Sequence, residues 1–260
     1  MTAMDGLQTW VINLDRAPER LARIRAQLQR LGLPFTRLRA VDARELTAAQ
    51  HAELDEPAYR RKHGMAPVMG ELGCYLSHVH VIQQLLAGTA AFALVLEDDV
   101  LLHDSLPAVL HGLMKHAERW DVVKLSAVHR GTPVPVLALA PGHHLAVMLS
   151  RCTGSSAFLL NRRAAAAYLR PVDGLLPMSL PYDHVFDQGW RFGIQFRLVT
   201  PTPCGHDDQI ASTIGATSAT NKSRKFHWTR RFGAYGYRLG NECRRLMYGL
   251  RESLRERIKA

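Results

Sequence analysis

Apolar segments of strand length alternate with segments of helical periodicity along most of the chain, and this alternation limits the possible folds more than any other feature of the sequence. Residues 9–14, TWVINL, predict a strand, and the helix that follows from Asp15 ends before Gly32. Further strands are predicted over residues 35–42, 92–97, 121–125, 144–149 and 155–160, and further helices over 70–87 and 161–170. Because such alternation is typical of α/β proteins, we expect a mostly parallel sheet flanked by helices.

Length and composition favour one globular domain with an appendage. The chain has 260 residues, of which 47% are hydrophobic, and this suffices to bury a substantial core. No apolar run is long enough to span a bilayer, and the first residues, MTAMDGLQTWVINL, lack the basic and then apolar pattern of a signal peptide. The four cysteines lie far apart, which favours reduced packing thiols over a zinc or redox pair. We therefore expect a cytoplasmic protein with a body at residues 1–220 and a tail at residues 221–260.

Three adjacent carboxylates end one of the predicted strands. Residues 92–104 read FALVLEDDVLLHD, so Glu97, Asp98 and Asp99 directly follow a buried segment. Ligands of α/β sheets collect at the carboxyl ends of the strands, and clustered carboxylates repel one another unless cations or donor groups neutralise them. Because carboxylate oxygens are hard ligands, the cluster predicts a Mg²⁺ or Mn²⁺ site that could also bind a diphosphate. The alternative is that these residues cap the next helix or face solvent.

Four stretches, in this order along the chain, resemble glycosyltransferase family 25, which makes lipooligosaccharide sugars and is related to collagen galactosyltransferases. They are VINLDRAPERL at residues 11–21, MGELGCYLSH at 69–78, LVLEDDV at 94–100, and TGSSAFLLNRRAA at 153–165 followed by PYDHVFD at 181–187. The resemblance runs from about residue 8 to about residue 210. The basic tail lies outside it.

The resemblance implies a GT-A-type fold that binds a nucleotide sugar. It also implies inverting transfer of a hexose, most often galactose from UDP-galactose, to a saccharide such as the lipid-linked lipooligosaccharide or lipopolysaccharide core. In the family's acidic metal motif, Asp99 would ligate Mn²⁺ or Mg²⁺, Glu97 would contact the ribose or a metal-bound water, and Asp98 would support either. A divalent ion across the diphosphate would stabilise the charge that develops on the departing UDP.

The first strand-to-helix turn carries candidate donor-binding residues. Asn13, Asp15 and Arg16 leave the sheet just before a helix begins, where backbone N–H groups and a guanidinium can contact a nucleotide or its phosphates. The match to the family favours donor binding for Asn13 and Arg16. For Asp15 a helix cap is equally supported, and Arg16 as a solvated surface charge is the other alternative.

A second set of candidates lies at the start of the helix that contains GELGCYLSH. Gly70 and Gly73 cost about 1 kcal/mol each relative to alanine in a helix, so close approach of a ligand or of another backbone would explain them. Glu71, Ser77 and His78 are then candidates for the donor pocket, since Glu71 and His78 share one helix face. The alternatives are a capping role for Glu71 and a satisfied core hydrogen bond for His78.

An inverting transferase needs a base that removes the proton from the attacking hydroxyl. Asp183, in the PYDHVFD segment, is the preferred candidate, and Asp187, one helical turn further on, is the reserve. The alternative is that Asp183 caps the following helix. His206, with Asp207 and Asp208 beside it, is a candidate for a further metal ligand or an acceptor contact, and a plain acidic loop is the alternative.

The basic charge is concentrated in the tail. Residues 221–260 hold twelve lysines and arginines and three glutamates, so they carry +9 of the chain's net +10. Apolar residues of the tail recur at intervals of three or four residues and would therefore form one stripe along a helix. The stripe consists of Leu239, Cys243, Leu246, Met247, Leu250, Leu254 and Ile258. This pattern is typical of an interfacial helix on anionic lipid, and it predicts peripheral attachment to the inner face of the membrane beside a lipid-linked acceptor. The alternative is that the stripe packs on the body or in a dimer.

Two other classes of function stay open. One is a nucleic-acid-binding protein or metal-dependent phosphodiesterase, suggested by the net charge of +10 and the carboxylate cluster. Because the cations are confined to the tail and no nucleic-acid motif occurs, we expect no nucleic acid as a partner. The other is a noncatalytic protein that binds a nucleotide sugar or acts as a scaffold. The intact run of three carboxylates argues against it.

Overall fold

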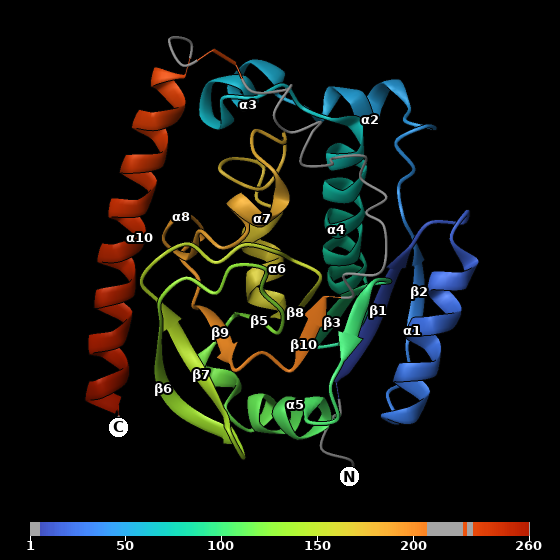
Figure 1. Ribbon diagram of the computed structural model, residues 1–260, viewed down its shortest axis with the longest axis vertical. Coiled ribbons are helices and arrows are strands. Elements are labelled where there is room, and N and C mark those ends of the chain that lie inside the picture. Colours follow the sequence, from blue (N-terminus) through green and yellow to red (C-terminus); the bar gives the residue numbers. More distant parts are fainter. Residues whose placement is uncertain (1–5, 207–225, 228–230, 260) are drawn as a thin grey trace.

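The computed structural model describes residues 6–206, 226–227 and 231–259 (Figure 1). The elements of the first half are β1 (Leu7–Asn13), α1 (Pro18–Arg30), β2 (Thr36–Arg39), α2 (Ala48–Ala52), α3 (Glu56–His63), α4 (Met69–Ala87), β3 (Phe92–Glu97), β4 (Val100–Leu102), α5 (Leu106–Lys115) and a 3₁₀ turn at Ala117–Arg119. Those of the second half are β5 (Val122–Lys124), β6 (Pro133–Ala140), β7 (His143–Met148), β8 (Ala157–Asn161), α6 (Arg162–Tyr168), α7 (Tyr182–Val185), α8 (Gly189–Phe192), β9 (Phe196–Thr200), β10 (Cys204–His206) and α10 (Phe232–Lys259).

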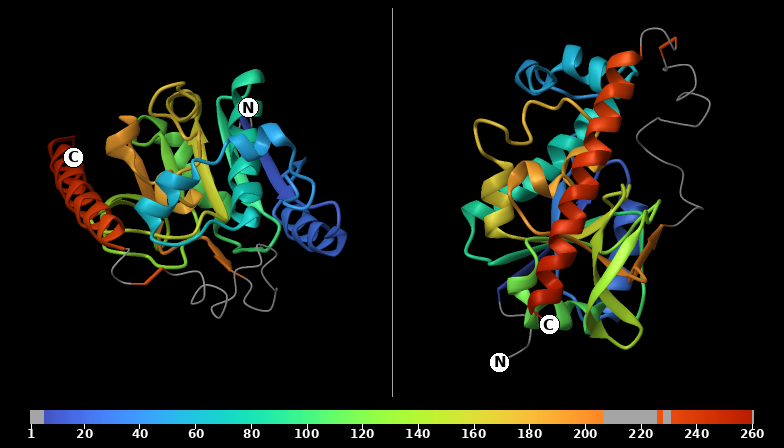
Figure 2. Two further views of the ribbon diagram at one scale, coloured as in Figure 1. Left: turned by 90° about the horizontal axis from the view of Figure 1, so that it is seen from above. Right: turned by 90° about the vertical axis from the view of Figure 1, so that its left-hand side faces the viewer.

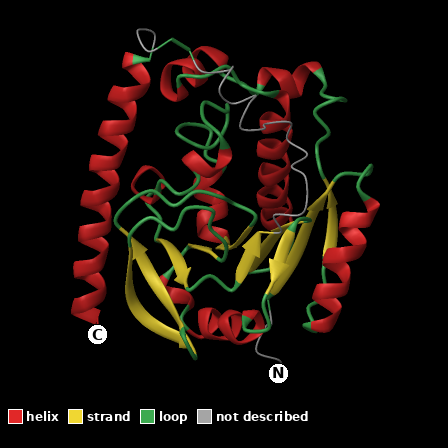
Figure 3. Ribbon diagram, in the orientation of Figure 1, coloured by secondary structure: helices red, strands yellow, loops and turns green. Residues whose placement is uncertain are grey.

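An eight-stranded sheet forms the centre of the molecule, in the order β2-β1-β3-β8-β5-β9-β7-β6, and β10 pairs with β4 beside it. The pairs β1–β2, β1–β3 and β5–β9 are parallel, and the other four pairs of the sheet are antiparallel. The expected α/β class, with flanking helices and a C-terminal helix, is confirmed (Figure 3). The sheet is mixed, and parallel pairing prevails only around β1.

Helices cover both faces of the sheet and bury two cores. One core joins the sheet to α4, α6, α7 and α8, and the other joins it to α1 and α5. Ile12 belongs to the first core and its neighbour Val11 to the second. This division follows from strand geometry, because successive side chains point to opposite faces. With both faces of β1 and β3 buried, the polar residues that follow these strands gather at one edge of the sheet.

Most of the predicted strands and helices are present; β9 was not among the predicted strands, nor was the longer β6. Its sequence, PVPVLALA, contains two prolines, which argue against a central strand. In the structure β6 is the last strand of the sheet, paired only with β7 among the described residues. Proline is tolerated there because an edge strand leaves one row of N–H groups without a sheet partner.

The long helix α10 lies against the body along the edge of the sheet formed by β6 and β7, and also contacts α3 and α8 (Figure 2). No helix in the described part of the chain is both long and apolar enough to cross a bilayer. Gly249 lies so close to β7 that an added Cβ would stand 2.4 Å from the carbonyl oxygen of Met148. The absence of a side chain at this position lets the two backbones approach each other.

Helix α10 turns its polar side toward the body. Arg245 forms two contacts with the carboxylate of Asp187, at 2.7 and 3.1 Å. Arg197, which is fully buried in β9, lies 2.9 Å from Glu252 and 3.0 Å from Glu256. The apolar stripe is therefore left facing outward, and the alternative that it packs on the body is wrong.

Candidate functional site

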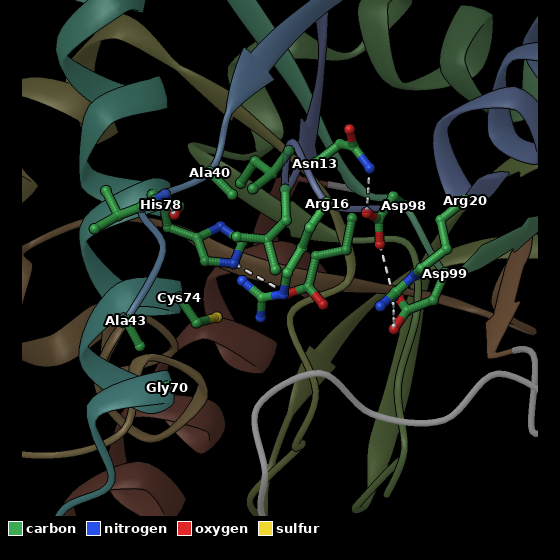
Figure 4. A pocket seen from close by; sticks show the side chains of 15 residues that line it. Asn13, Arg16, Arg20, Ala40, Ala43, Gly70, Cys74, His78, Asp98 and Asp99 are labelled. Carbon is green, nitrogen blue, oxygen red and sulfur yellow. Dashed lines mark hydrogen bonds and ion pairs between the residues drawn. The ribbon is translucent and has the colours of Figure 1, made fainter. Parts of the chain in front are cut away.

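A pocket opens at the carboxyl ends of β1 and β3 (Figure 4). The register pairs Ile12 with Glu97, so Asn13 and the carboxylate run lie side by side. The first turns of α4 and the loop after β2 form the facing wall. The pocket is lined by Ile12, Asn13, Leu14, Arg16, Arg20, Ala40, Val41, Ala43, Gly70, Cys74, Ser77, His78, Glu97, Asp98 and Asp99. Of the predicted site residues, it brings together Asn13, Arg16, Ser77, His78, Glu97, Asp98 and Asp99.

Arg20, in the first turn of α1, places a cation inside the carboxylate run. One of its Nη atoms lies 2.6 Å from Oδ1 of Asp98 and 2.7 Å from Oδ2 of Asp99. Asn13 donates a hydrogen bond to the other oxygen of Asp98 at 2.6 Å. Burial raises the pKa of Asp98, although the Asn13 hydrogen bond and the charge of Arg20 act in the opposite direction. The repulsion expected within the carboxylate run is thus offset in part by a side chain of the protein.

Glu97 instead contacts α4. Its Oε1 lies 3.1 Å from Nε2 of His78, and one ligand atom from each of Cys74, His78 and Glu97 lies within 4.8 Å of the others. The ring of His78 stacks on Tyr182, with ring centroids 4.3 Å apart. Burial, increased by the negative charges of Glu97 and Asp183, raises the pKa of the Cys74 thiol. Because a thiol binds metal as the thiolate, Glu97 and His78 are the better ligands of this cluster.

Arg16 is positioned at the pocket by an ion pair with Asp42, which lies shortly after β2. A hydrogen bond from the backbone N–H of Arg44, together with the Arg16 guanidinium, lowers the pKa of Asp42. The Arg16 side chain keeps about a third of its surface exposed (32%). Arg16 can therefore reach an anionic ligand and is not a fully solvated surface charge.

Asp15 does not line the pocket. Its carboxylate binds Arg37 and Arg39 at 2.5 and 2.6 Å, and the hydrogen bond from Arg37 lowers its pKa. Helix α1 begins after Ala17, and no side chain caps it. Both predicted roles of Asp15, donor contact and helix cap, are therefore corrected. The residue holds the turn between β1 and α1 against β2 through Arg37 and Arg39.

The structure explains one of the two glycines at the start of α4. A Cβ on Gly73 would stand 2.6 Å from the carbonyl oxygen of Val41, so close approach of another backbone explains this glycine. Ser77 supports the same contact, because its hydroxyl accepts a hydrogen bond from the N–H of Val41 at 2.8 Å. Glu71 lies outside the pocket lining; it accepts hydrogen bonds from Tyr59 at 2.6 Å and from the backbone at the helix start at 3.4 Å. The capping alternative for Glu71 is the one that the structure supports.

Asp183 lies in α7, beside the pocket but outside its lining. Its Oδ2 accepts a hydrogen bond from the N–H of Gly154 at 3.2 Å, and its side chain is 27% exposed. Helix α7 begins after Pro181 with no side-chain cap, so Asp183 is not the predicted cap. Its influence on the pKa of Cys74 places it within electrostatic reach of the pocket.

Asp187 requires a correction. The residue is 1% exposed, and both oxygens of its carboxylate bind Arg245 of α10. A buried carboxylate held in this way cannot reach an acceptor hydroxyl in this conformation. Asp187 is a docking residue for α10, and it is withdrawn as the reserve base.

His206 ends β10, where the register pairs it with Val100 of β4. Its backbone therefore lies next to the chain segment that carries Asp99. Asp207 and Asp208, its predicted companions, lie outside the described residues. The candidate role of His206 as a further metal ligand stays a prediction, and the pairing of the short strands β4 and β10 was not predicted from the sequence.

Arg20 and Cys74 line the pocket but were not predicted from the sequence. Each had a signal in the sequence. Arg20 lies within VINLDRAPERL, and Cys74 lies four residues before His78 in α4, on the same helix face. Cysteine was interpreted only as a packing residue because no paired spacing was present.

Comparison with known proteins identifies a family of glycosyltransferases. Residues 7–132, which contain the pocket lining, match the profile of glycosyltransferase family 25, described as LPS biosynthesis protein. A probable inactive glycosyltransferase 25 family member 3 from Rattus norvegicus is 27% identical over 85% of this chain and 43% of its own length. Procollagen galactosyltransferase 1-A from Xenopus laevis is 24% identical over 86% of this chain and 40% of its own.

A third relative, a glycosyltransferase 25 family member from Aedes aegypti, is 31% identical over 44% of this chain and 20% of its own length. The chain therefore spans less than half the length of these curated relatives. Their names include both a galactosyltransferase and a probable inactive member.

Proposed function

Because residues 7–132 place this chain in glycosyltransferase family 25, we propose that it transfers galactose from UDP-galactose, with inversion, to a saccharide acceptor. The observation that carries the proposal is the pocket at the carboxyl edge of the sheet, where a carboxylate run and an exposed guanidinium face one cavity. A nucleotide diphosphate needs both kinds of group, carboxylates for a bridging cation and an arginine for phosphate oxygens. The proposed acceptor is the lipid-linked core of a lipooligosaccharide or lipopolysaccharide.

Arg16 is the proposed phosphate ligand. Its pairing with Asp42 limits the rotamers that the long side chain can adopt, so less entropy is lost when a phosphate binds. Asn13 acts through its neighbours: it donates to Asp98 and to the carbonyl oxygen of Ala17, and thereby holds the turn between β1 and α1 in place. His78, stacked on Tyr182, holds Glu97 from the opposite wall.

The residues present fit a divalent ion. Glu97 lies with His78 and Cys74 in one set of potential ligands, and Asp99 lines the same pocket. Glu97 and Asp99 would hold Mn²⁺ or Mg²⁺, and His206 is proposed as a further ligand from the neighbouring strand. When bound, the ion would neutralise the charge that develops on the diphosphate of the departing UDP.

Asp183 is the proposed base. It lies outside the pocket lining and keeps an exposed fraction of 27%, so an acceptor hydroxyl can approach it from solvent. The hydrogen bond from Gly154 fixes Oδ2, and Oδ1, which lies 3.8 Å from Nε2 of His184, would receive the proton. A base must receive the proton of the attacking hydroxyl within hydrogen-bond reach, and inversion requires that it stand opposite the leaving UDP.

Calorimetric titration with UDP, with and without Mn²⁺, is the primary test. The unaltered chain is expected to bind UDP only when Mn²⁺ is present, and Asp99→Asn is expected to weaken that binding by at least about tenfold, since one hydrogen bond or metal contact to a charged group contributes about 1.5–3 kcal/mol. Asp104→Asn is the matched control, because Asp104 is 83% exposed and lies outside the pocket. UDP-galactose and UDP-glucose are then compared by release of UDP in the presence of acceptor saccharide.

Two results would contradict the proposal. If Asp99→Asn binds UDP with unchanged affinity and metal dependence, the carboxylate run is structural. If UDP does not bind under either condition, the nucleic-acid class becomes the next hypothesis, and the salt dependence of binding to nucleic acid is measured instead.

The contact of Arg20 with Asp98 and Asp99 favours a second candidate function, a noncatalytic protein that binds a nucleotide sugar. A guanidinium that already neutralises two of the three carboxylates removes part of the need for a metal ion. This candidate predicts UDP binding that is independent of Mn²⁺ and no release of UDP from the sugar nucleotide. The same titration, followed by the release assay, therefore separates the two candidates.

A further inference from the structure

We propose that the outward side of α10 is a docking surface for an anionic lipid bilayer. The surface, called here the outer ridge, consists of Leu239, Cys243, Leu246, Met247, Leu250, Leu254 and Ile258. The proposal does not depend on the chemistry of the pocket. It rests on the orientation in which α10 docks and on the charges that docking leaves exposed.

The outer ridge faces outward because the other side of α10 is bound to the body. The buried residues of the helix include Arg245, Glu252 and Glu256, and each forms an ion pair with a residue of the body. In an ordinary surface helix the apolar side is buried and the polar side is solvated. This helix has the reverse arrangement, and its docking uses buried ion pairs.

The exposure of the ridge is continuous along the helix. The exposed fractions are 70% for Leu239, 63% for Met247, 50% for Leu250, 60% for Leu254 and 85% for Ile258. No other element of the described chain passes over this side of α10 in the view that faces it (Figure 2, right). Isolated exposed apolar residues are common on proteins, whereas a contiguous row of this kind marks an interaction surface.

The charges beside the ridge identify the partner as anionic. Docking buries Glu252 and Glu256, so Glu242 is the one acidic residue of α10 that stays partly exposed. The exposed cations of the helix are Arg244, Arg251, Arg255, Arg257 and Lys259. An apolar row bordered by cations complements a bilayer with anionic headgroups, because the apolar residues enter the acyl boundary while the cations contact phosphates.

A groove adjoining the ridge extends the cationic border onto the body. It lies between α8 and α10, and Arg163, Arg244 and Arg251 line it together with Trp190. Arginine binds phosphate oxygens in a bidentate manner, and tryptophan is enriched where protein meets the lipid headgroups. The cationic area therefore includes residues from two elements that are distant in sequence.

A second copy of the chain fits this surface less well than lipid. In a symmetric dimer across α10 the same surface would meet itself, and the exposed arginines of one helix would find almost no exposed carboxylate on the other. Like charges held together in this way destabilise an interface. We therefore assign the ridge to lipid, and dimerisation is an outcome that the experiment must be able to detect.

The test is sedimentation of the full chain with vesicles of phosphatidylcholine, with and without phosphatidylglycerol. Binding is expected only to the anionic vesicles and should weaken as salt increases. The variant Leu250→Gln with Leu254→Gln should lose roughly a hundredfold or more in affinity, the factor that corresponds to about 3 kcal/mol for two leucine side chains. Glutamine keeps helix propensity, so the helix itself is expected to remain.

Charge is tested separately by Arg244→Gln with Arg251→Gln. Each lost cation should weaken binding about fivefold, the factor that corresponds to about 1 kcal/mol per charge near an anionic surface. Val172→Gln and Arg130→Gln are the matched controls, because both residues are exposed but lie far from α10 in sequence and outside the groove. The controls should bind vesicles like the unaltered chain.

Cys243 allows binding to vesicles to be measured directly on a chain whose leucines and arginines are unaltered. It is the exposed cysteine of the described chain, and an environment-sensitive dye attached there should shift its emission to the blue on anionic vesicles. Equal binding by Leu250→Gln/Leu254→Gln and the unaltered chain would overturn the proposal. So would a dimer in analytical ultracentrifugation that dissociates in this variant while no binding to vesicles is detected.

Discussion

At the scale of single residues, Arg20 is expected to affect both the stability of the protein and the pocket. It is 8% exposed and contacts both Asp98 and Asp99, which are themselves mostly buried. Removing one partner of a buried ion pair leaves an uncompensated charge in a poorly solvated place. The exposed ion pair of Arg30 and Asp104 shows the opposite situation, since water solvates both groups.

We expect Arg20→Gln to lower the free energy of unfolding by about 3 kcal/mol, the cost typical of a broken buried pair. Arg30→Gln is the matched control, and it should change the unfolding free energy by less than about 0.5 kcal/mol. Both values come from urea unfolding followed by circular dichroism. Equal effects of the two substitutions would mean that the contact of Arg20 with the carboxylates contributes nothing specific.

Residue patterns predicted part of the pocket and failed where partners are distant in sequence. Asn13 and Glu97 were identified because each ends a strand, and His78 because it shares a helix face with Glu71. The pairing of Arg20 with Asp98 spans 78 positions and depends on how α1 packs on the sheet. No local pattern encodes that distance, so the motif VINLDRAPERL could mark Arg20 as a site residue but could not show that it contacts the carboxylate run.

At the scale of elements, α10 shows what helical periodicity does and does not determine. The spacing of apolar residues predicted a helix, and the helix is present. The side that packs on the body was a separate question, because apolar burial and ion pairing are both possible docking modes. The buried Arg197 of β9 draws the polar side of α10 to the body through ion pairs with Glu252 and Glu256. These partners are more than fifty residues away along the chain.

Two glycines of α10 should respond to alanine with opposite signs. Gly249→Ala should destabilise the protein by about 1–3 kcal/mol, because the added Cβ would press on the carbonyl oxygen of Met148. Gly240→Ala should stabilise it by up to about 1 kcal/mol, since nothing lies within 4 Å of the added atom and alanine favours the helix. Thermal and urea unfolding of both variants measure these changes. A loss of stability in both would show that α10 does not pack as described.

At the scale of the whole molecule, the order of strands and helices predicted the α/β class but not the pairing of the later strands. The parallel pairs of β1 with β2 and β3 follow from helices that connect successive strands. β8 inserts between β3 and β5 and pairs antiparallel with both. That choice depends on contacts between distant segments, which local periodicity does not contain.

Ending the chain at residue 231 should destabilise the body as well as remove the tail. Arg197 and Asp187 would lose their buried partners, and we expect a decrease of at least about 3 kcal/mol in the free energy of unfolding. Ending the chain after Arg257 is the control; it keeps Glu256 and should cost less than about 0.5 kcal/mol.

Adding Arg197→Met and Asp187→Asn to the shorter chain tests the cause. These changes remove the two buried charges that the shorter chain leaves without partners, and they should recover part of the lost free energy of unfolding. If the shorter chain is as stable as the full one in urea, α10 is an independent appendage and the buried ion pairs do not couple it to the body.

The placement of α10 also gives the molecule an electrical polarity. Residues 221–260 carry +9 of the net +10, and α10 lies along the β6–β7 edge, with most of the sheet between it and the pocket beside β1 and β3. Near a negatively charged surface such a body experiences a torque before any contact is made, and it rotates until its positive pole leads. The outer ridge would then reach the surface already oriented for docking, so fewer encounters would be unproductive.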